Sequence, residues 1–127
     1  MSKTILVVED DPDVAQVIAD ILRDHDHRIT LAQSGEAMRR CLESGSRIDC
    51  VVLDAVLPGE PGDMLAEELV RRAIPVLICS GSLTALQSAQ RRGLPALAKP
   101  FRATELLRSV ERAMRSEKRA ASGRKSV

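Results

Sequence analysis

Short apolar runs alternate with segments of helical periodicity from one end of the chain to the other. The apolar runs predict five strands, over residues 4–8, 28–32, 48–53, 75–79 and 94–98. Between and after them, apolar residues recur every three or four positions, as on one face of an amphipathic helix. This second pattern predicts helices over residues 12–25, 34–45, 62–74, about 83–91 and about 102–116. Five strands that each precede a helix predict an α/β fold with a parallel sheet covered on both faces.

The periodic positions also predict which helix side chains face the core. On the first, third and last helices these are, in order, Val14, Val17, Ile18, Ile21 and Leu22; Leu65, Leu69 and Val70; and Ala103, Leu106, Leu107, Val110 and Met114. Pro12 suits the first helical turn, where a backbone N–H would lack a partner anyway. Asp11, directly before it, is predicted to cap this helix, since acids favour helix N-termini.

Acidic residues stand at the ends of two predicted strands. Glu9, Asp10 and Asp11 follow the first strand, and Asp54 follows the third. The carboxyl ends of parallel strands share one edge, where ligands of open α/β folds bind, so we expect several of these acids in one crevice. Each pair of such charges repels by roughly 4 kcal/mol at about 4 Å and an effective dielectric of 20. The cluster therefore needs a cation, and Mg²⁺ suits oxygen ligands.

Two further polar residues follow the remaining strands at this edge, Ser80 after the fourth and Lys99 after the fifth. With the acids, they suit phosphoryl transfer to a carboxylate. Asp54 would be the nucleophile and form an aspartyl-phosphate. Lys99 would bind a phosphoryl oxygen as a point charge, and Ser80 would donate a hydrogen bond once phosphate is present.

The acids would hold the metal ion that this chemistry requires. We expect Mg²⁺ to be bound by Asp10, Asp54 and the Val56 backbone carbonyl, with Glu9 acting directly or through water. The ion would neutralise charge that develops on the phosphoryl oxygens.

Four stretches carry a family resemblance, at residues 5–12, 51–59, 75–81 and 99–101. Over about residues 3–117 the chain resembles a response-regulator receiver domain of two-component signalling, as in single-domain chemotaxis regulators. The resemblance implies a flavodoxin-like, doubly wound (βα)₅ sheet, a Mg²⁺ requirement and phosphorylation by a histidine kinase or a histidine phosphotransfer protein. It also implies output by contact with a downstream protein, as a monomer or a phosphorylation-dependent dimer. Such a domain catalyses only its own phosphorylation and dephosphorylation.

Three positions depart from the family pattern. Glu9 replaces the more frequent aspartate, and Ala96 stands three before the lysine, where the family usually carries an aromatic switch residue. Output would then pass through backbone and loop shifts or through another surface. Val56, two beyond Asp54, has an apolar side chain that cannot orient an attacking water. We therefore predict a long-lived phosphoryl group.

Composition excludes several other classes of protein. The 127 residues carry a formal net charge of +1, which favours neither nucleic acid nor a membrane as a direct partner. The apolar runs are too short to span a bilayer, and no signal peptide is visible. Three cysteines in apolar contexts read as reduced core residues of a cytoplasmic protein. We expect a receiver domain over residues 1–119, a basic, disordered tail over 120–127, and no attached output domain.

Other interpretations stay open. A pseudo-receiver would keep the fold and signal by binding alone, which Ala96 favours and the intact Asp54 opposes. A haloacid-dehalogenase-like phosphatase would need a second aspartate at position 56 and a cap insertion. Ser80 with Gly81 reads equally well as a helix N-cap. We interpret His25 and His27 as residues that complement a helix dipole. We interpret three arginine pairs as parts of solvated helix faces, at residues 39–40, 71–72 and 91–92.

Overall fold

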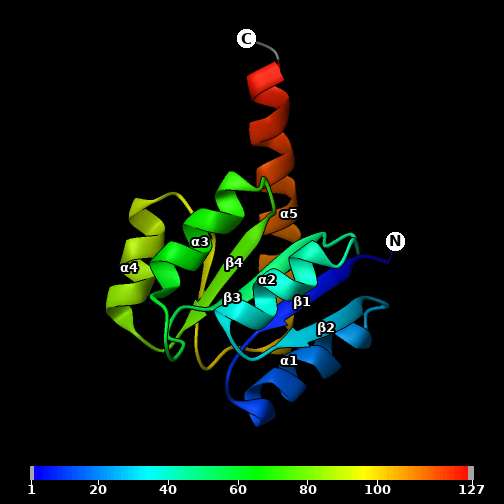
Figure 1. Ribbon diagram of the computed structural model, residues 1–127, viewed down its shortest axis with the longest axis vertical. Helices are drawn as coiled ribbons and strands as arrows, with labels where there is room; N and C mark the ends of the chain where they lie inside the picture. Colours follow the sequence, from blue (N-terminus) through cyan, green and yellow to red (C-terminus); the bar gives the residue numbers. More distant parts are fainter. Residues whose placement is uncertain (1, 126–127) are drawn as a thin grey trace.

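The computed structural model describes residues 2–125, with the side chains of residues 2–115, and shows five strands that alternate with five helices (Figure 1). In chain order the elements are β1 (Thr4–Val8), α1 (Pro12–Arg23), β2 (Arg28–Ala32), α2 (Gly35–Glu43), β3 (Cys50–Asp54), α3 (Gly62–Arg71), β4 (Val76–Ser80), α4 (Leu83–Arg91), β5 (Ala96–Ala98) and α5 (Ala103–Lys125). The predicted α/β class and (βα)₅ order are confirmed.

All the strand pairs are parallel, and the strand order is β2-β1-β3-β4-β5. This is the doubly wound, flavodoxin-like order that the sequence resemblance implied. The order reverses between β1 and β3, and the crevice outside the carboxyl ends of two such strands is where open α/β sheets bind ligands. The last residue of β3 is Asp54, whereas the acids after β1 begin at Glu9. The acids therefore flank the reversal.

Two layers of apolar side chains bury the two faces of the sheet. One layer packs α2, α3 and α4 against the sheet, through Met38, Leu65, Leu69 and Ala89 among others. The other packs α1 and α5 on the opposite face, through Ile18, Leu22, Leu106 and Val110 among others. In β1, β3 and β4 nearly every side chain is buried, because helices cover these strands on both faces. The rigid sheet thus carries the residues at its carboxyl edge.

Side chains that cap the helices explain where several of them begin. The Asp11 carboxylate accepts hydrogen bonds from the backbone N–H groups of Asp13 and Val14, which confirms it as the cap of α1. The cap of α4 is Ser82, whose hydroxyl accepts from the Ala85 N–H. The N-cap alternative for Ser80 was therefore wrong, because the helix begins two residues later than that role requires.

Three predicted core positions are exposed, and one of them is Ala103 at the start of α5. Val17 is 56% exposed and Val70 is 41% exposed. On α1 the buried stripe consists of Ala15, Ile18, Ala19 and Leu22, at the i, i+3, i+4, i+7 spacing of one helix face. Ala15 and Ala19 thus belong to the buried face of α1, whereas the prediction, which was based on large apolar residues, had placed Val17 there. The buried face of the helix is therefore rotated about the helix axis relative to the predicted face.

The last helix extends beyond its predicted end near residue 116. The backbone of α5 is helical to Lys125, and it projects away from the sheet in Figure 1. Residues 117–121 consist entirely of alanine, lysine, arginine and glutamate, which favour helices. Most of the predicted tail, 120–127, thus lies in helical backbone, and residues 126–127 lie outside the described residues. The domain boundary at residue 119 stays a prediction.

None of the helices within residues 2–125 combines the length and the apolar character that a membrane crossing requires. Cys50 and Cys79 are buried in the core, Cys41 is half-buried, and all three are free thiols, as the sequence predicted. Burial raises the pKa of the Cys79 thiol to about 12, and that of Cys50 to about 12 as well. Both thiols therefore stay protonated at neutral pH and act as small apolar core groups.

Candidate functional site

Asp54 lies at the carboxyl end of β3, the central strand of the sheet, and only 9% of it is exposed. Its Oδ1 accepts a hydrogen bond from the Val56 N–H at 3.1 Å, which orients the carboxylate. Glu9 and Asp10 come from the segment after β1, and the Glu9 N–H donates to the Ala32 carbonyl at 3.0 Å. This bond fixes the start of the acidic segment against β2.

The three carboxylates approach one another as predicted. Glu9, Asp10 and Asp54 each offer one oxygen, and these oxygens lie within 4.8 Å of one another. Glu9 is 3% exposed, whereas Asp10 is open to solvent. A set of hard carboxylate oxygens, one open to water, fits a Mg²⁺ ion, which keeps several waters in its shell. The donor chemistry of the site therefore suits this metal.

Lys99 neutralises part of the acidic cluster. Its ammonium Nζ donates to Glu9 Oε1 at 2.6 Å and lies 3.7 Å from Asp54 Oδ2. Burial lowers the pKa of Lys99, but the hydrogen bond to Glu9 and the charges of Asp54 and Glu9 outweigh this effect. The net result is a pKa above the usual value for lysine, so the side chain is a permanent cation at neutral pH.

Ser80 is the last residue of β4. The residue before it, Cys79, pairs in register with Asp54 of β3, so Ser80 ends its strand beside Asp54. The Ser80 hydroxyl is buried, and its oxygen accepts from the Ser82 N–H at 2.9 Å. Because the oxygen is the acceptor in this bond, the hydroxyl proton can be donated elsewhere. The Lys99 N–H donates to the Ser80 carbonyl at 2.9 Å, which links the ends of β4 and β5.

An apolar groove of about 460 Å³ lies next to Lys99. Its lining comes from α1 and from the segment after β5, and consists of Asp13, Val14, Val17, Lys99, Pro100 and Phe101. The peptide bond between Lys99 and Pro100 is cis. The exposed Val17, which the sequence assigned to the core, thus belongs to a surface beside the site.

The predicted site residues do meet at one edge, since Glu9, Asp10, Asp54 and Lys99 form one cluster and Ser80 ends the strand next to Asp54. His27 lies at the far end of the strands, where its Nδ1 accepts from the Lys3 N–H at 3.3 Å. The two histidines are thus remote from the acids, as expected.

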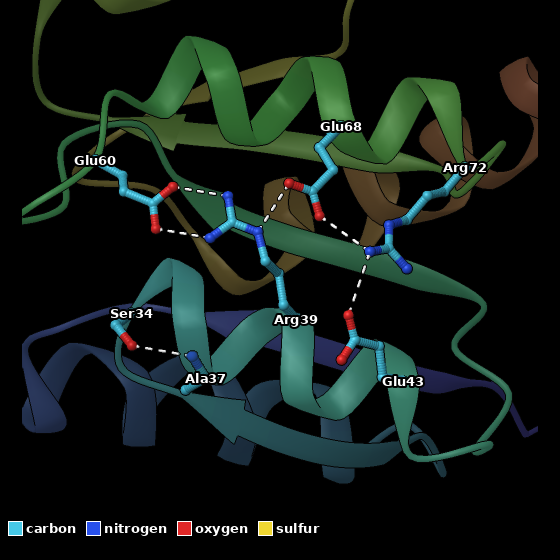
Figure 2. Close-up of polar contacts among 7 residues, drawn as sticks. All are labelled: Ser34, Ala37, Arg39, Glu43, Glu60, Glu68 and Arg72. Carbon is cyan, nitrogen blue, oxygen red and sulfur yellow. Dashed lines mark hydrogen bonds and ion pairs between the residues drawn. The ribbon is translucent and has the colours of Figure 1, made fainter.

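Sequence reasoning missed an ion-pair network between α2 and α3. Arg39 forms a double hydrogen bond with Glu60 and a third with Glu68, which in turn pairs with Arg72 (Figure 2). The interpretation of the arginine pairs as solvated helix faces was therefore wrong for Arg39 and Arg72, and also for Arg92, which pairs with Asp63 at 3.6 Å. Arginine and glutamate are 21 and 29 residues apart in the two Arg39 pairs, so no local pattern signals them.

Comparisons with known proteins agree with the fold. A family model described as response regulator receiver domain matches residues 5–111. Over 121 residues, 91% of this chain, the sequence is 31% identical to the DNA-binding transcriptional regulator NtrC of Rhizobium meliloti, of which it covers 25%. It is 25% identical to the regulatory protein VanR of Enterococcus faecium over 123 residues, or 94% of this chain and 53% of VanR.

A solved structure is similar over nearly its whole length. The receiver domain of NtrX from Brucella abortus superposes with a TM-score of 0.79 and 31% identity, covering 87% of this chain and 98% of that domain. By contrast, the chain spans only about a quarter to a half of the length of the curated relatives that it matches. The similarity therefore concerns one domain of those larger proteins.

Proposed function

The chain belongs to the response regulator receiver domain family, and on this premise we propose that it accepts a phosphoryl group on Asp54 from a phosphohistidine of a partner protein. Domains of this family are regulatory. The proposal adds that the chain catalyses only its own phosphorylation and dephosphorylation, and that a histidine kinase or histidine phosphotransfer protein is the donor.

One observation carries the proposal. The Asp54 carboxylate is nearly buried, lies within 4.8 Å of the oxygens of two other acids, and has the Lys99 ammonium 3.7 Å away. A structural aspartate needs neither neighbouring acids nor a shared lysine. A carboxylate that must receive a phosphoryl group needs both a cation site and a fixed positive charge.

The residues of the chain divide the chemistry among them. An Asp54 oxygen attacks phosphorus, the P–N bond of the phosphohistidine breaks, and its electron pair returns to the imidazole nitrogen. The Lys99 ammonium group leaves Glu9 and binds one phosphoryl oxygen. The Ser80 hydroxyl donates a hydrogen bond to another phosphoryl oxygen. Glu9, Asp10, Asp54 and the Val56 carbonyl would hold Mg²⁺, which supplies positive charge where the phosphoryl oxygens gather.

The groove beside Lys99 supports a protein donor. Apolar side chains of Val14, Val17 and Phe101 line it, and Val17 is 56% exposed. A helical partner that covers these residues would bring its phosphohistidine next to Lys99 and exclude water. We propose that the downstream output also passes through protein contacts, with no direct contact to nucleic acid. The free cysteines fit a cytoplasmic location for this exchange.

Intact-mass measurement tests the proposal. The protein is incubated with Mg²⁺ and a small acyl-phosphate donor, beside an Asp54→Asn control that keeps the shape of the side chain but cannot act as the acceptor. We expect the mass of one phosphoryl group on the wild type alone, and its loss when EDTA is added first.

The outcome separates this function from the pseudo-receiver. Equal masses for both proteins, together with no Mg²⁺ binding, would reject phosphoryl acceptance and favour a module that signals by binding alone. Addition to the Asp54→Asn variant as well would place the acceptor on another residue. A purified phosphohistidine protein used as donor then tests the proposed class of partner.

A further inference from the structure

The loop between β3 and α3, residues 55–61, is closed on itself. Val56 and Pro61 form an antiparallel bridge across it. At its base, a Cβ added to Gly62 would lie 2.1 Å from the Ala55 carbonyl oxygen, so the two ends of the loop touch through their backbones. The outgoing side of the loop therefore cannot move without the returning side.

The outgoing side belongs to the candidate site. The Val56 N–H donates to Asp54 Oδ1, and the Val56 carbonyl is one of the metal ligands in the proposed function. The Val56 side chain is 62% exposed, so its own packing does little to fix the residue. Backbone bonds hold the start of this side, since the Ala55 N–H donates to the Cys79 carbonyl at 3.1 Å, and the returning side of the loop can fix it further.

The returning side is fixed by Arg39 of α2. Its Nη1 and Nη2 donate to the two carboxylate oxygens of Glu60, at 2.8 and 2.7 Å (Figure 2). A bidentate pair of this kind sets the plane of the carboxylate as well as its distance. The guanidinium is itself anchored on α3, because its Nε donates to Glu68 Oε1 at 2.9 Å.

Charge and packing agree with this arrangement. The hydrogen bonds to Glu60 and Glu68 raise the pKa of Arg39, and the bond to Arg39 lowers the pKa of Glu60. Glu60 also lies close to the first turn of α2, since a Cβ at Gly35 would be 2.7 Å from its Oε1. Both partners are about one-third exposed, so the pair contributes position more than stability.

We propose that Arg39 is a positioning residue for the metal site, acting through Glu60 to hold the closed loop so that the Val56 carbonyl and the Asp54 carboxylate face one cation. The inference rests on the proposed function, because it requires Mg²⁺ to bind at this cluster. Loss of a residue that orients a metal ligand typically weakens binding about 10- to 100-fold. Arg39 acts through one more residue, so we expect a smaller loss, of about 3- to 10-fold.

Calorimetric Mg²⁺ titration tests the proposal, since the chain has no tryptophan or tyrosine to report binding by fluorescence. The variants are Arg39→Gln and Glu60→Gln, with Arg40→Gln as the matched control. Arg40 is the next residue of α2, and among the described residues its exposed side chain forms its ion pair within the helix, with Glu36 at 3.5 Å. We expect Arg39→Gln and Glu60→Gln, the two loop variants, to bind Mg²⁺ about 3- to 10-fold more weakly than the wild type. The control Arg40→Gln should bind as the wild type does.

The sign of the effect distinguishes position from charge. If only charge mattered, loss of the negative Glu60 would weaken cation binding, and loss of the positive Arg39 would strengthen it. Positioning through the pair predicts weaker binding in both variants. It also predicts that Arg39→Gln combined with Glu60→Gln is no weaker than either alone, because the two changes break the same contact.

A second measurement keeps the test valid for each variant. Spectra of the backbone amides in the metal-free proteins would show shifted Ala55 and Val56 signals in the two loop variants, with the signals of β1 and α5 unchanged. Wild-type Mg²⁺ affinity or tighter binding in Arg39→Gln would overturn the positioning role and leave the proposed function intact. A wild-type protein that binds no Mg²⁺ would overturn both.

Discussion

Lys99 donates its shortest hydrogen bond to Glu9, at 2.6 Å, rather than to the phosphoacceptor candidate Asp54, which lies 3.7 Å away. The extra methylene of glutamate, relative to the aspartate more usual in the family, lets Glu9 reach the lysine. Both Glu9 oxygens are engaged, since Oε2 accepts from the Asp11 N–H at 3.2 Å. A cation that binds at the acids therefore competes with Lys99 for Glu9, and this exchange would free the lysine for the phosphoryl group.

The first prediction concerns the loss of this lysine. In Lys99→Met, we expect Mg²⁺ to bind about 3- to 30-fold more tightly, because a positive charge about 4 Å from the acids no longer opposes the metal. Stability without metal should fall by about 1–3 kcal/mol, since the Glu9 carboxylate, 3% exposed, loses its partner. Calorimetric titration and urea unfolding measure the two effects. Lys3→Met, which changes the net charge equally at the far end of the sheet, should alter neither.

The phosphorylation rate should respond in the opposite direction. Without the ammonium group, Lys99→Met cannot bind a phosphoryl oxygen, so the rate with an acyl-phosphate donor should fall even though the metal binds better. Tighter Mg²⁺ binding with an undiminished rate would show that the lysine serves only to neutralise the acids.

The second prediction concerns the lifetime of the phosphoryl group. The Val56 side chain is exposed beside Asp54 and has no group that can hold an attacking water. We expect Val56→Asn to shorten the phosphoprotein half-life by about 3- to 30-fold, since orientation of a water by a side chain contributes part of general acid–base catalysis. Loss of the phosphoryl mass with time measures it. Val56→Leu, which keeps an apolar side chain, should decay at the wild-type rate, and rapid decay of the wild type itself would contradict the argument.

The sequence predicted the carboxyl edge of the sheet well, for a physical reason. A buried strand must end where its apolar run ends, and parallel strands end on one side, so Asp54, Ser80 and Lys99 could be placed together from three separate segments. The structure moves Asp54 and Ser80 inside β3 and β4 by one residue, as their last members. This shift of one residue did not change which residues lie together at the carboxyl edge of the sheet.

The sequence could not predict contacts between helices. Whether Arg39 reaches Glu60 depends on how α2 packs beside α3, and this packing is decided by buried side chains such as Met38 and Leu69. Nor could the pattern predict that Ala15 and Ala19, rather than Val17, face the sheet, because small residues carry little hydrophobic signal yet fit where a helix lies close. How Ala96 changes the output of the domain stays a prediction.

The third prediction concerns acidic pH. Burial, followed by the nearby His25, lowers the pKa of His27 below its usual value of about 6.5. The unfolded chain then binds a proton that the folded protein does not, so the free energy of unfolding should fall as pH drops below about 6.5, and level off below the folded pKa. Histidine NMR titration gives the pKa, and urea unfolding gives the slope.

Variants of the two histidines separate the causes of this shift. His27→Asn should flatten the pH dependence of stability between pH 7.5 and 5.5, whereas His25→Asn should raise the pKa of His27 by removing a nearby positive charge. A pKa of His27 that does not change in His25→Asn would mean that His25 does not contribute to the shift.

The fourth prediction compares two glycines next to the site. A methyl group on Gly62 would lie 2.1 Å from the Ala55 carbonyl oxygen, which is backbone and cannot turn aside, whereas a methyl group on Gly81 would meet nothing within 4 Å. We expect Gly62→Ala to lower the free energy of unfolding by about 1–3 kcal/mol. Gly81→Ala should stay within about 0.5 kcal/mol of the wild type.

Urea unfolding followed by circular dichroism measures both values, and Mg²⁺ titration of the folded variants adds the functional effect. Because Ala55 lies between Asp54 and Val56, a loop forced open by Gly62→Ala should separate two proposed metal ligands and weaken Mg²⁺ binding. Gly81→Ala leaves these ligands in place. If the two variants unfold at the same urea concentration and bind Mg²⁺ equally, then the contact between Gly62 and Ala55 yields without cost, and the loop is not rigid enough to hold the Val56 carbonyl.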